Sequence, residues 1–241
     1  MYFKVSKKEF YNALSVAARA ISTFSPLPAF SGVKIEATMD CLILTGSDSD
    51  ISIQTKLKKS EHCVLEIHDM GSIVIEAKYI LEIVRKIDAD EIEFEMLDGS
   101  LTKISGNTAE FRINGMRASE YPAIDFSKPN ECFNVSEDIL KKIILQTSFA
   151  TSDKETRPVL TGVNFQCKEH QLHCVATDSY RLAKKTVEIE ESLNFNITIP
   201  AKSLQEVVKT LEGEGDVEIA VNDKKAQFII HDTIVQTRLI D

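Results

Sequence analysis

Two cysteines and two histidines stand close together in the second half of the chain, in the pattern Cys167-x-x-His170-x-x-His173-Cys174. Thiolate and imidazole groups are the usual ligands of zinc, so a metal site is the first chemistry to consider. This spacing matches no common zinc module. The segment also has the pattern of two strands joined by a turn, and alternation along a strand would send His173 and Cys174 to opposite faces. We therefore expect structural roles and no bound metal.

No constellation of residues in the sequence indicates catalysis. The G-x-S-x-G turn of serine hydrolases, the Walker phosphate loop and the G-x-G-x-x-G loop are all absent. Asp48 and Asp178 each follow a predicted strand and precede a serine, which is typical of a side chain that caps a turn. We expect no enzyme activity and no cofactor. An enzyme for a small molecule stays open as an alternative, and a deep pocket with shifted pKa values would favour it.

Four segments with helical periodicity carry basic side chains on their polar faces. In the first, Lys8, Asn12 and Arg19 are spaced so that they share one face, opposite an apolar stripe. Lysine and arginine contact DNA phosphates without reading bases, and much of the acid lies in other segments, such as 88–91. From charge alone, the favoured interpretation is that these are ordinary helix faces exposed to solvent and not a DNA-binding surface. The candidate DNA contacts are Lys8, Asn12, Arg19, Lys78, Lys142, Arg157, Lys202 and Lys209.

The elements that must position these residues occur twice along the chain. Ser31-Gly-Val-Lys-Ile-Glu-Ala37 matches Thr161-Gly-Val-Asn-Phe-Gln-Cys167 at an offset of 130 residues, and this offset holds from Phe3 to Ser49. Two later matches pair Ile75–Lys78 with Ile199–Lys202 and Ala109–Phe111 with Ala226–Phe228. Prolines and polar residues interrupt the periodicity at 121–130. The chain is therefore predicted to hold two copies of one domain, 1–126 and 127–241.

Each copy is predicted to be an α+β domain of two β-α-β-β-β halves with much antiparallel sheet. In the first copy, Ser6 and Glu9 form a capping-box pattern at the start of a helix over 7–21, and a second helix is expected over 77–87. The strands predicted there are 3–5, 33–37, 42–46, 51–57, 64–68, 73–75, 91–96, 101–105 and 109–113. In the second copy, strands 163–167 and 172–177 flank the turn of the histidine–cysteine segment.

Composition limits the classes of protein to which the chain can belong. It has 241 residues, a net charge of −9 and 43% hydrophobic residues, which suffices for packed cores and argues against an indiscriminate nucleic-acid binder. No signal peptide and no apolar run long enough to cross a membrane is present. We expect a cytoplasmic protein whose five cysteines are reduced.

The loop Ala176-Thr-Asp-Ser-Tyr-Arg-Leu-Ala183 departs most from its counterpart, Gly46-Ser-Asp-Ser-Asp-Ile-Ser-Ile53, although the framework around it matches. A loop that differs between two copies of one domain is a candidate for a specialised function. A hairpin with a solvent-exposed arginine is the plainer interpretation of the same residues.

This loop resembles the motif A-T-D-[GS]-[HY]-R-[LM]-A of bacterial DNA sliding clamps, the beta subunits of DNA polymerase III. Three other segments are also clamp-like: Pro26-Leu-Pro28 before Gly32, Glu120-Tyr-Pro122, and Asp153 to Leu160. The resemblance covers the whole chain in order. It implies the DNA clamp fold, in which helices line the inner face of a ring and antiparallel sheets form its outer face.

The resemblance also implies a function. Such clamps have three domains per chain and form a head-to-tail homodimer that encircles duplex DNA without sequence preference. They are non-catalytic processivity factors for the replicative polymerase. The polymerase III alpha subunit, the clamp loader and repair polymerases dock short Q-L-x-L-F-like peptides on them. By this resemblance a third domain is expected to follow Asp241, so that this chain alone should not close the ring.

On this chain the resemblance assigns part of the peptide pocket. Leu160 and Leu182 would form an apolar floor, Tyr180 a wall, and Arg181 polar contacts to the peptide. The complete set is Leu160, Thr177, Ser179, Tyr180, Arg181 and Leu182. A DNA-contacting arginine of some relatives is replaced here by Phe24.

A two-domain clamp of the archaeal and eukaryotic kind, which closes its ring as a trimer, is the alternative within the same class. Chain length fits it, whereas the loop motif favours the bacterial family. The oligomer mass would discriminate the two.

Overall fold

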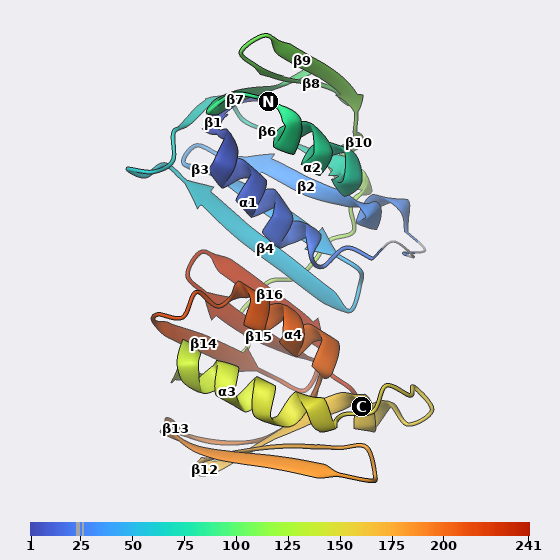
Figure 1. Ribbon diagram of the computed structural model, residues 1–241, viewed down its shortest axis with the longest axis vertical. Coiled ribbons are helices and arrows are strands. Elements are labelled where there is room, and N and C mark those ends of the chain that lie inside the picture. The colour runs from blue at the N-terminus through green and yellow to red at the C-terminus, as the bar shows by residue number, and fades with distance from the viewer. Residues whose placement is uncertain (23–24, 26) are drawn as a thin grey trace. The chain divides into compact units, whose positions relative to one another are not determined.

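The computed structural model describes residues 1–22, 25 and 27–241. Phe24 and Pro26, two positions at which the chain is compared with sliding clamps, lie outside the described residues. The chain divides into two compact units, 1–125 and 126–241. Figure 1 labels the elements of both units and colours them along the chain from blue to red.

In the first unit, helices α1 (Lys7–Ala18) and α2 (Ala77–Lys86) lie side by side against antiparallel sheet (Figure 1). One sheet has the order β5-β1-β7-β8-β9, and strands β10-β6-β2-β3-β4 follow one another in a second. Short 3-10 turns cover Pro28–Ser31 and Ala118–Glu120. The strands are β1 (Tyr2–Ser6), β2 (Gly32–Ala37), β3 (Cys41–Ser47), β4 (Ile51–Lys58), β5 (Leu65–Asp69), β6 (Gly71–Glu76), β7 (Glu91–Asp98), β8 (Leu101–Gly106), β9 (Ala109–Asn114) and β10 (Met116–Arg117).

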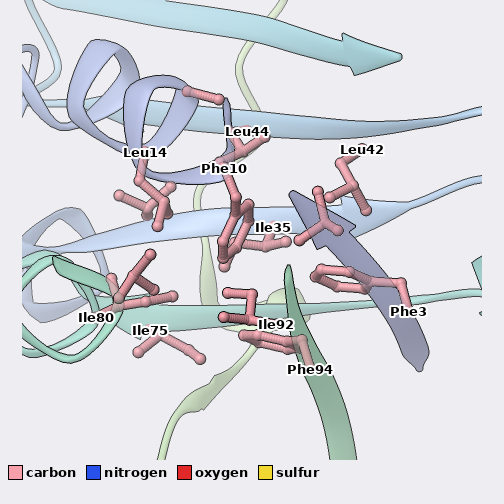
Figure 2. Packing of buried hydrophobic residues seen from close by; sticks show 14 of the residues in the cluster. Phe3, Phe10, Leu14, Ile35, Leu42, Leu44, Ile75, Ile80, Ile92 and Phe94 are labelled. Carbon is pink, nitrogen blue, oxygen red and sulfur yellow. The ribbon is translucent and has the colours of Figure 1, made fainter. Parts of the chain in front are cut away.

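The core of the first unit lies between its helices and its sheets. The apolar stripe of α1 is buried, and Figure 2 shows Phe10 and Leu14 directed from the helix toward the strands. The rings of Phe3 and Phe94, on paired strands, stack with their centres 4.8 Å apart, and Phe10 meets Phe3 edge to face at 5.7 Å. Burying each such side chain stabilises the fold by about 1.5–3 kcal/mol.

The second unit repeats this plan with longer strands. Helices α3 (Glu137–Thr147) and α4 (Ala201–Thr210) contact each other, and strands β16-β15-β14-β11 follow one another in a sheet. Strands β12 and β13 form a separate antiparallel pair, whose register breaks between Glu169 and Gln171. Two 3-10 turns cover Ser148–Ala150 and Pro158–Thr161. The strands are β11 (Glu131–Ser136), β12 (Gly162–Thr177), β13 (Leu182–Pro200), β14 (Asp216–Val221), β15 (Lys225–Ile230) and β16 (Thr233–Arg238).

The repeat predicted from sequence recurs at the level of single hydrogen bonds. The Oγ of Ser31 donates to the carbonyl of Pro28 at 2.7 Å, and the Oγ1 of Thr161 donates to the carbonyl of Pro158 at 2.7 Å. Each of these turns leads into the glycine that begins β2 or β12. The element order of the two units confirms the α+β class with antiparallel sheets, and the β-α-β-β-β arrangement is present twice in the first unit, in β1-α1-β2-β3-β4 and in β6-α2-β7-β8-β9.

One of the predicted matches between the copies is wrong by one strand. Ala109–Phe111 begins β9, the third strand after helix α2, whereas Ala226–Phe228 lies in β15, the second strand after α4. The buried Phe228 pairs with Ile219 on β14, and it is Ile104 on β8 that occupies the same place in the first unit, opposite Phe94. A match of three residues between amphipathic strands is too short to identify which strands of the two copies are equivalent.

Three local predictions also need correction. Ser6 does not cap α1 with its side chain, because its Oγ instead accepts from the backbone N–H of Val64 at 2.7 Å. Helix α1 ends at Ala18, with Arg19 as its C-cap, and does not reach Ile21. The two strands predicted at 163–167 and 172–177 are joined in one strand, β12, and only the register break between Glu169 and Gln171 marks their division.

Candidate functional site

The loop between β12 and β13 is a tight turn built by two side chains. The Oγ1 of Thr177 donates to the carbonyl of Arg181 at 2.7 Å and accepts from the backbone N–H of Ser179 at 3.2 Å. The Oδ1 of Asp178 accepts from the backbone N–H groups of Tyr180 and Arg181, both at 3.0 Å. Ser179 has φ of 77°, in the left-handed region. These bonds are all local, so the turn needs no partner from elsewhere in the fold.

The matching loop between β3 and β4 in the first unit is the same turn. The Oγ of Ser47 donates to the carbonyl of Ile51 at 3.0 Å and accepts from the N–H of Ser49 at 3.2 Å. The Oδ1 of Asp48 accepts from the N–H groups of Asp50 and Ile51 at 3.0 and 2.9 Å. Ser49 has φ of 87°. The interpretation of both aspartates as turn caps is confirmed, and the two loops differ in the side chains that they display.

The second-unit turn displays large side chains to solvent. Tyr180 is 97% exposed and Leu182 is 66% exposed, whereas Ile51, the counterpart of Arg181, is only 8% exposed. Exposed aromatic and aliphatic groups of this size on a rigid turn are suited to serve as anchors for a partner. Leu160 is half-buried in the 3-10 turn Pro158–Thr161, which precedes β12, and its carbonyl accepts from the N–H of Ser152 at 2.8 Å.

Two contacts hold the side chain of Arg181. Its Nε donates to the Oδ2 of Asp178 at 3.0 Å, and its guanidinium carbon lies 5.5 Å from the ring centre of Phe149. The backbone N–H groups of Tyr180 and Arg181, and then the guanidinium of Arg181, lower the pKa of Asp178. Phe149 itself is 58% exposed, in the 3-10 turn after α3. Sequence reasoning missed Phe149, because a phenylalanine just after an amphipathic helix gives no local sign that it will meet a loop 32 residues further on.

The candidate DNA contacts of the first unit lie on its two helices. Lys8 and Asn12 are exposed on α1, and Arg19 is half-buried at its C-cap. Lys78 is exposed on α2, with its Nζ 5.8 Å from the ring centre of Tyr79. The shared polar face expected for α1 is therefore present, although Arg19 is less exposed than the two residues before it.

In the second unit the candidates differ in their partners. Lys142 on α3 pairs with Asp138 at 2.6 Å, and Lys209 on α4 pairs with Glu206 at 2.8 Å. Lys202 is exposed on the first turn of α4, and Arg157 is exposed just before the 3-10 turn at Pro158. The Lys142–Asp138 pair is exposed on both sides and contributes little to stability, so Lys142 can exchange its carboxylate partner for a phosphate.

The histidine–cysteine segment of β12 does not gather into a metal site. Among the residues described, no three His, Cys, Asp or Glu side chains come together in a way that could hold a metal ion. Cys167 and Cys174 are fully buried, and burial raises the pKa of both thiols. His173 is half-buried, with its Nδ1 2.9 Å from the Oγ1 of Thr186. Its different burial from Cys174 is the alternation expected of neighbours on a strand.

A hollow of about 520 Å³ lies in the first unit beside the start of α1. Lysine and arginine side chains share its wall with two aspartates, so it offers no uniform charge to a ligand. The residues concerned are Lys7, Lys8, Tyr11, Arg85, Asp88, Ala89, Asp90 and Asn107. Across the described parts of the chain, no helix is both long enough and apolar enough to span a bilayer.

Comparison with known proteins decides the family. Residues 1–125 match the family model of the DNA polymerase III beta subunit, N-terminal domain, and residues 134–241 match the model of the central domain of the same subunit. The chain belongs to the DNA polymerase III beta subunit family. The resemblance carried by the turn motif and the repeat is thereby confirmed, and the two-domain archaeal and eukaryotic alternative is not supported.

Individual relatives of this beta subunit chain agree in sequence and in fold. The chain is 39% identical to the beta sliding clamp of Halalkalibacterium halodurans over 248 residues, an alignment that covers 100% of this chain and 65% of that protein. The crystal structure of the DNA polymerase sliding clamp from Bacillus subtilis superposes with a TM-score of 0.97 at 35% identity, again over 100% of this chain and 65% of that one. The beta chain from Streptococcus pneumoniae gives 0.95 at 32% identity with the same coverage. The chain thus spans 65% of the length of each of these relatives and has the clamp fold.

Proposed function

We propose that this chain forms the first two domains, 1–126 and 127–241, of a DNA sliding clamp that encircles duplex DNA and gives processivity to a replicative polymerase. The clamp would be a non-catalytic, cytoplasmic factor, completed by a third domain and a second subunit as a ring-shaped homodimer. The observation that carries the proposal is the turn at 177–182, which keeps the geometry of its first-unit counterpart but displays exposed Tyr180, Arg181 and Leu182.

The turn is suited to bind a short peptide. Leu182 and Tyr180 offer apolar surface on a backbone that is already ordered, so that little conformational entropy is lost on binding. Leu160 adds a half-buried apolar side chain. We propose that these residues, with Thr177, Ser179 and Arg181, form this chain's part of a pocket for Q-L-x-L-F-like peptides. The peptides would come from the polymerase III alpha subunit, the clamp loader and repair polymerases.

The helices are suited to contact DNA through its phosphates. Lys8, Asn12, Lys78 and Lys202 are exposed on α1, α2 and α4, where their charges and polar groups can meet phosphates whatever the base sequence. Electrostatic contacts to phosphates would let the protein move along the duplex. We include Arg19, Lys142, Arg157 and Lys209 in the same proposed set.

The pocket is tested by placing a charge on its floor. Leu182→Asp puts a carboxylate where the peptide's apolar side chains would lie, and we expect it to weaken the binding of a fluorescent Q-L-x-L-F peptide by about tenfold or more. Met39→Asp is the matched control, because Met39 is also an exposed apolar side chain, at 78%, in a turn of the first unit. Equal affinity of the two variants would contradict the pocket.

A further inference from the structure

The guanidinium of Arg181 is held on two sides while part of it stays available. Asp178 accepts from Nε at 3.0 Å, and the ring of Phe149 faces the group at 5.5 Å. An arginine has five N–H donors in a rigid planar fork, and the Nε–H is one of them. The two contacts therefore leave the four Nη N–H donors for an acceptor outside the turn.

The carboxylate of Asp178 does more than the turn requires. In the first unit, Asp48 makes the same two backbone hydrogen bonds, and the residue in the place of Arg181 is the buried Ile51. A turn of this kind therefore forms without any arginine. The third bond of Asp178, to Arg181 through Oδ2, is specific to the loop with the exposed anchors.

Phe149 supplies a contact that comes from outside the turn. It lies in the 3-10 turn after α3 and contacts the arginine across a gap of 32 residues in sequence. A ring beneath a guanidinium restricts the plane of the group, and the carboxylate restricts its rotation within that plane. Together they define the direction in which the Nη donors point.

We propose that Asp178 and Phe149 are positioning residues that hold Arg181 ready to donate to a carbonyl oxygen of the bound peptide. This inference rests on the proposed function of the loop. A carbonyl is favoured over a carboxylate, because the charge of Arg181 is already balanced by Asp178 and attracts a distant anion only weakly. The contact should then depend little on salt, unlike the contacts to DNA phosphates.

The variants that test the proposal distinguish the hydrogen bonds that form the turn from the hydrogen bond that holds Arg181. Asp178→Asn keeps an oxygen for the two backbone N–H groups but places an amide NH₂ where Nε needs an acceptor. Asp48→Asn makes the same change in the first-unit turn, which holds no arginine, and is the matched control. Phe149→Leu removes the ring, whereas Phe149→Tyr keeps it and should restore the wild-type behaviour.

Two readouts are taken by NMR on the 241-residue chain with a Q-L-x-L-F peptide. The first is the Nε–Hε signal of Arg181 without peptide, which should be resolved in the wild type and collapse to the position of a mobile arginine in Asp178→Asn and Phe149→Leu. The second is the peptide Kd at two salt concentrations, which should rise by about three- to tenfold in those two variants. Asp48→Asn and Phe149→Tyr should change neither.

Unchanged peptide affinity in Asp178→Asn and Phe149→Leu would overturn the proposal, and so would an equal loss in Asp48→Asn. A strongly salt-dependent loss would overturn the assignment of a carbonyl. If the resonances of the wild-type chain do not shift on addition of peptide, peptide recognition by this chain's part of the pocket fails and the peptide acceptor with it. In that case the Nε–Hε signal still shows separately whether the two residues hold the side chain.

Discussion

The carboxylate of Asp178 accepts two backbone N–H groups and one guanidinium N–H, and each of these favours its charged form. Its pKa is therefore lower than that of an ordinary aspartate. A group whose pKa is depressed on folding contributes stability at pH values above its unfolded pKa and loses it as the pH falls through its folded pKa. The order of the turn should consequently persist at neutral pH and be lost only in strong acid.

We predict that Asp178 titrates with a midpoint below the ordinary value of 3.8. The side-chain carboxyl ¹³C shift gives the midpoint directly, and the amide shifts of Tyr180 and Arg181 should follow the same curve because both N–H groups donate to this carboxylate. In Arg181→Ala the midpoint should move partway back, since the backbone donors are the larger cause and remain. A wild-type midpoint at or above 3.8 would contradict these hydrogen bonds.

Among the elements, the crossing of α1 over β3 depends on one glycine. A Cβ built on Gly46 would collide with the carbonyl oxygen of Ala17, which belongs to the helix backbone and cannot turn aside. In the second unit the counterpart of Gly46 is Ala176, which is buried with its methyl group in place. The first unit therefore has no room for a side chain at this position, whereas the second unit buries a methyl group there.

We predict that Gly46→Ala destabilises the first unit by about 3 kcal/mol, the upper end of the cost of overpacking, because the obstructing atom is backbone. Ala176→Gly is the matched change in the second unit and should cost only about 1 kcal/mol. Amide hydrogen exchange reports on the two units separately. Equal effects on both units, or no change in the first, would count against the close approach of α1 to β3.

Most elements follow from periodicity, and the exceptions have physical causes. The helices at Lys7 and Ala77 and most strand positions in the first unit agree with the sequence pattern, because alternation and helical spacing decide which face is buried. The capping box at Ser6 fails because the hydroxyl is taken by Val64, which is 58 residues away and invisible to a local pattern. Tertiary partners of this kind also explain why Phe149 was missed beside Arg181.

For the site, the motif located the turn and its exposed side chains, and the repeat identified the role of both aspartates. The assignment of Leu160, Thr177, Ser179, Tyr180, Arg181 and Leu182 to a peptide pocket stays a prediction. The assignment of the eight candidate DNA contacts also stays a prediction, because the charge of an exposed side chain does not by itself show which ligand it contacts.

For the molecule as a whole, a net charge of −9 and a proposed affinity for DNA are compatible only if the contacts are few and local. We predict weak DNA binding whose logarithm falls linearly with the logarithm of the salt concentration, by about 0.9 for each phosphate contacted on B-DNA. Lys202→Ala should lower the magnitude of this slope by about 0.9, the value for one phosphate contact. Lys103→Ala is the control, because Lys103 lies on β8 and pairs with Glu95 at 2.7 Å. Binding without salt dependence, or an equal effect of both variants, would contradict phosphate contacts from the helices.

The turn at 177–182 is proposed to recognise a partner peptide, whereas its counterpart at 47–51 is not. The most direct test is to add a Q-L-x-L-F peptide and to record which backbone amide NMR signals shift. The turns share their hydrogen bonds, so the first serves as an internal control within the same sample. We predict saturable shifts at Thr177–Leu182 and Leu160 with none at Ser47–Ile51. Equal shifts at the two turns, or shifts that avoid Thr177–Leu182 altogether, would contradict peptide recognition by this turn.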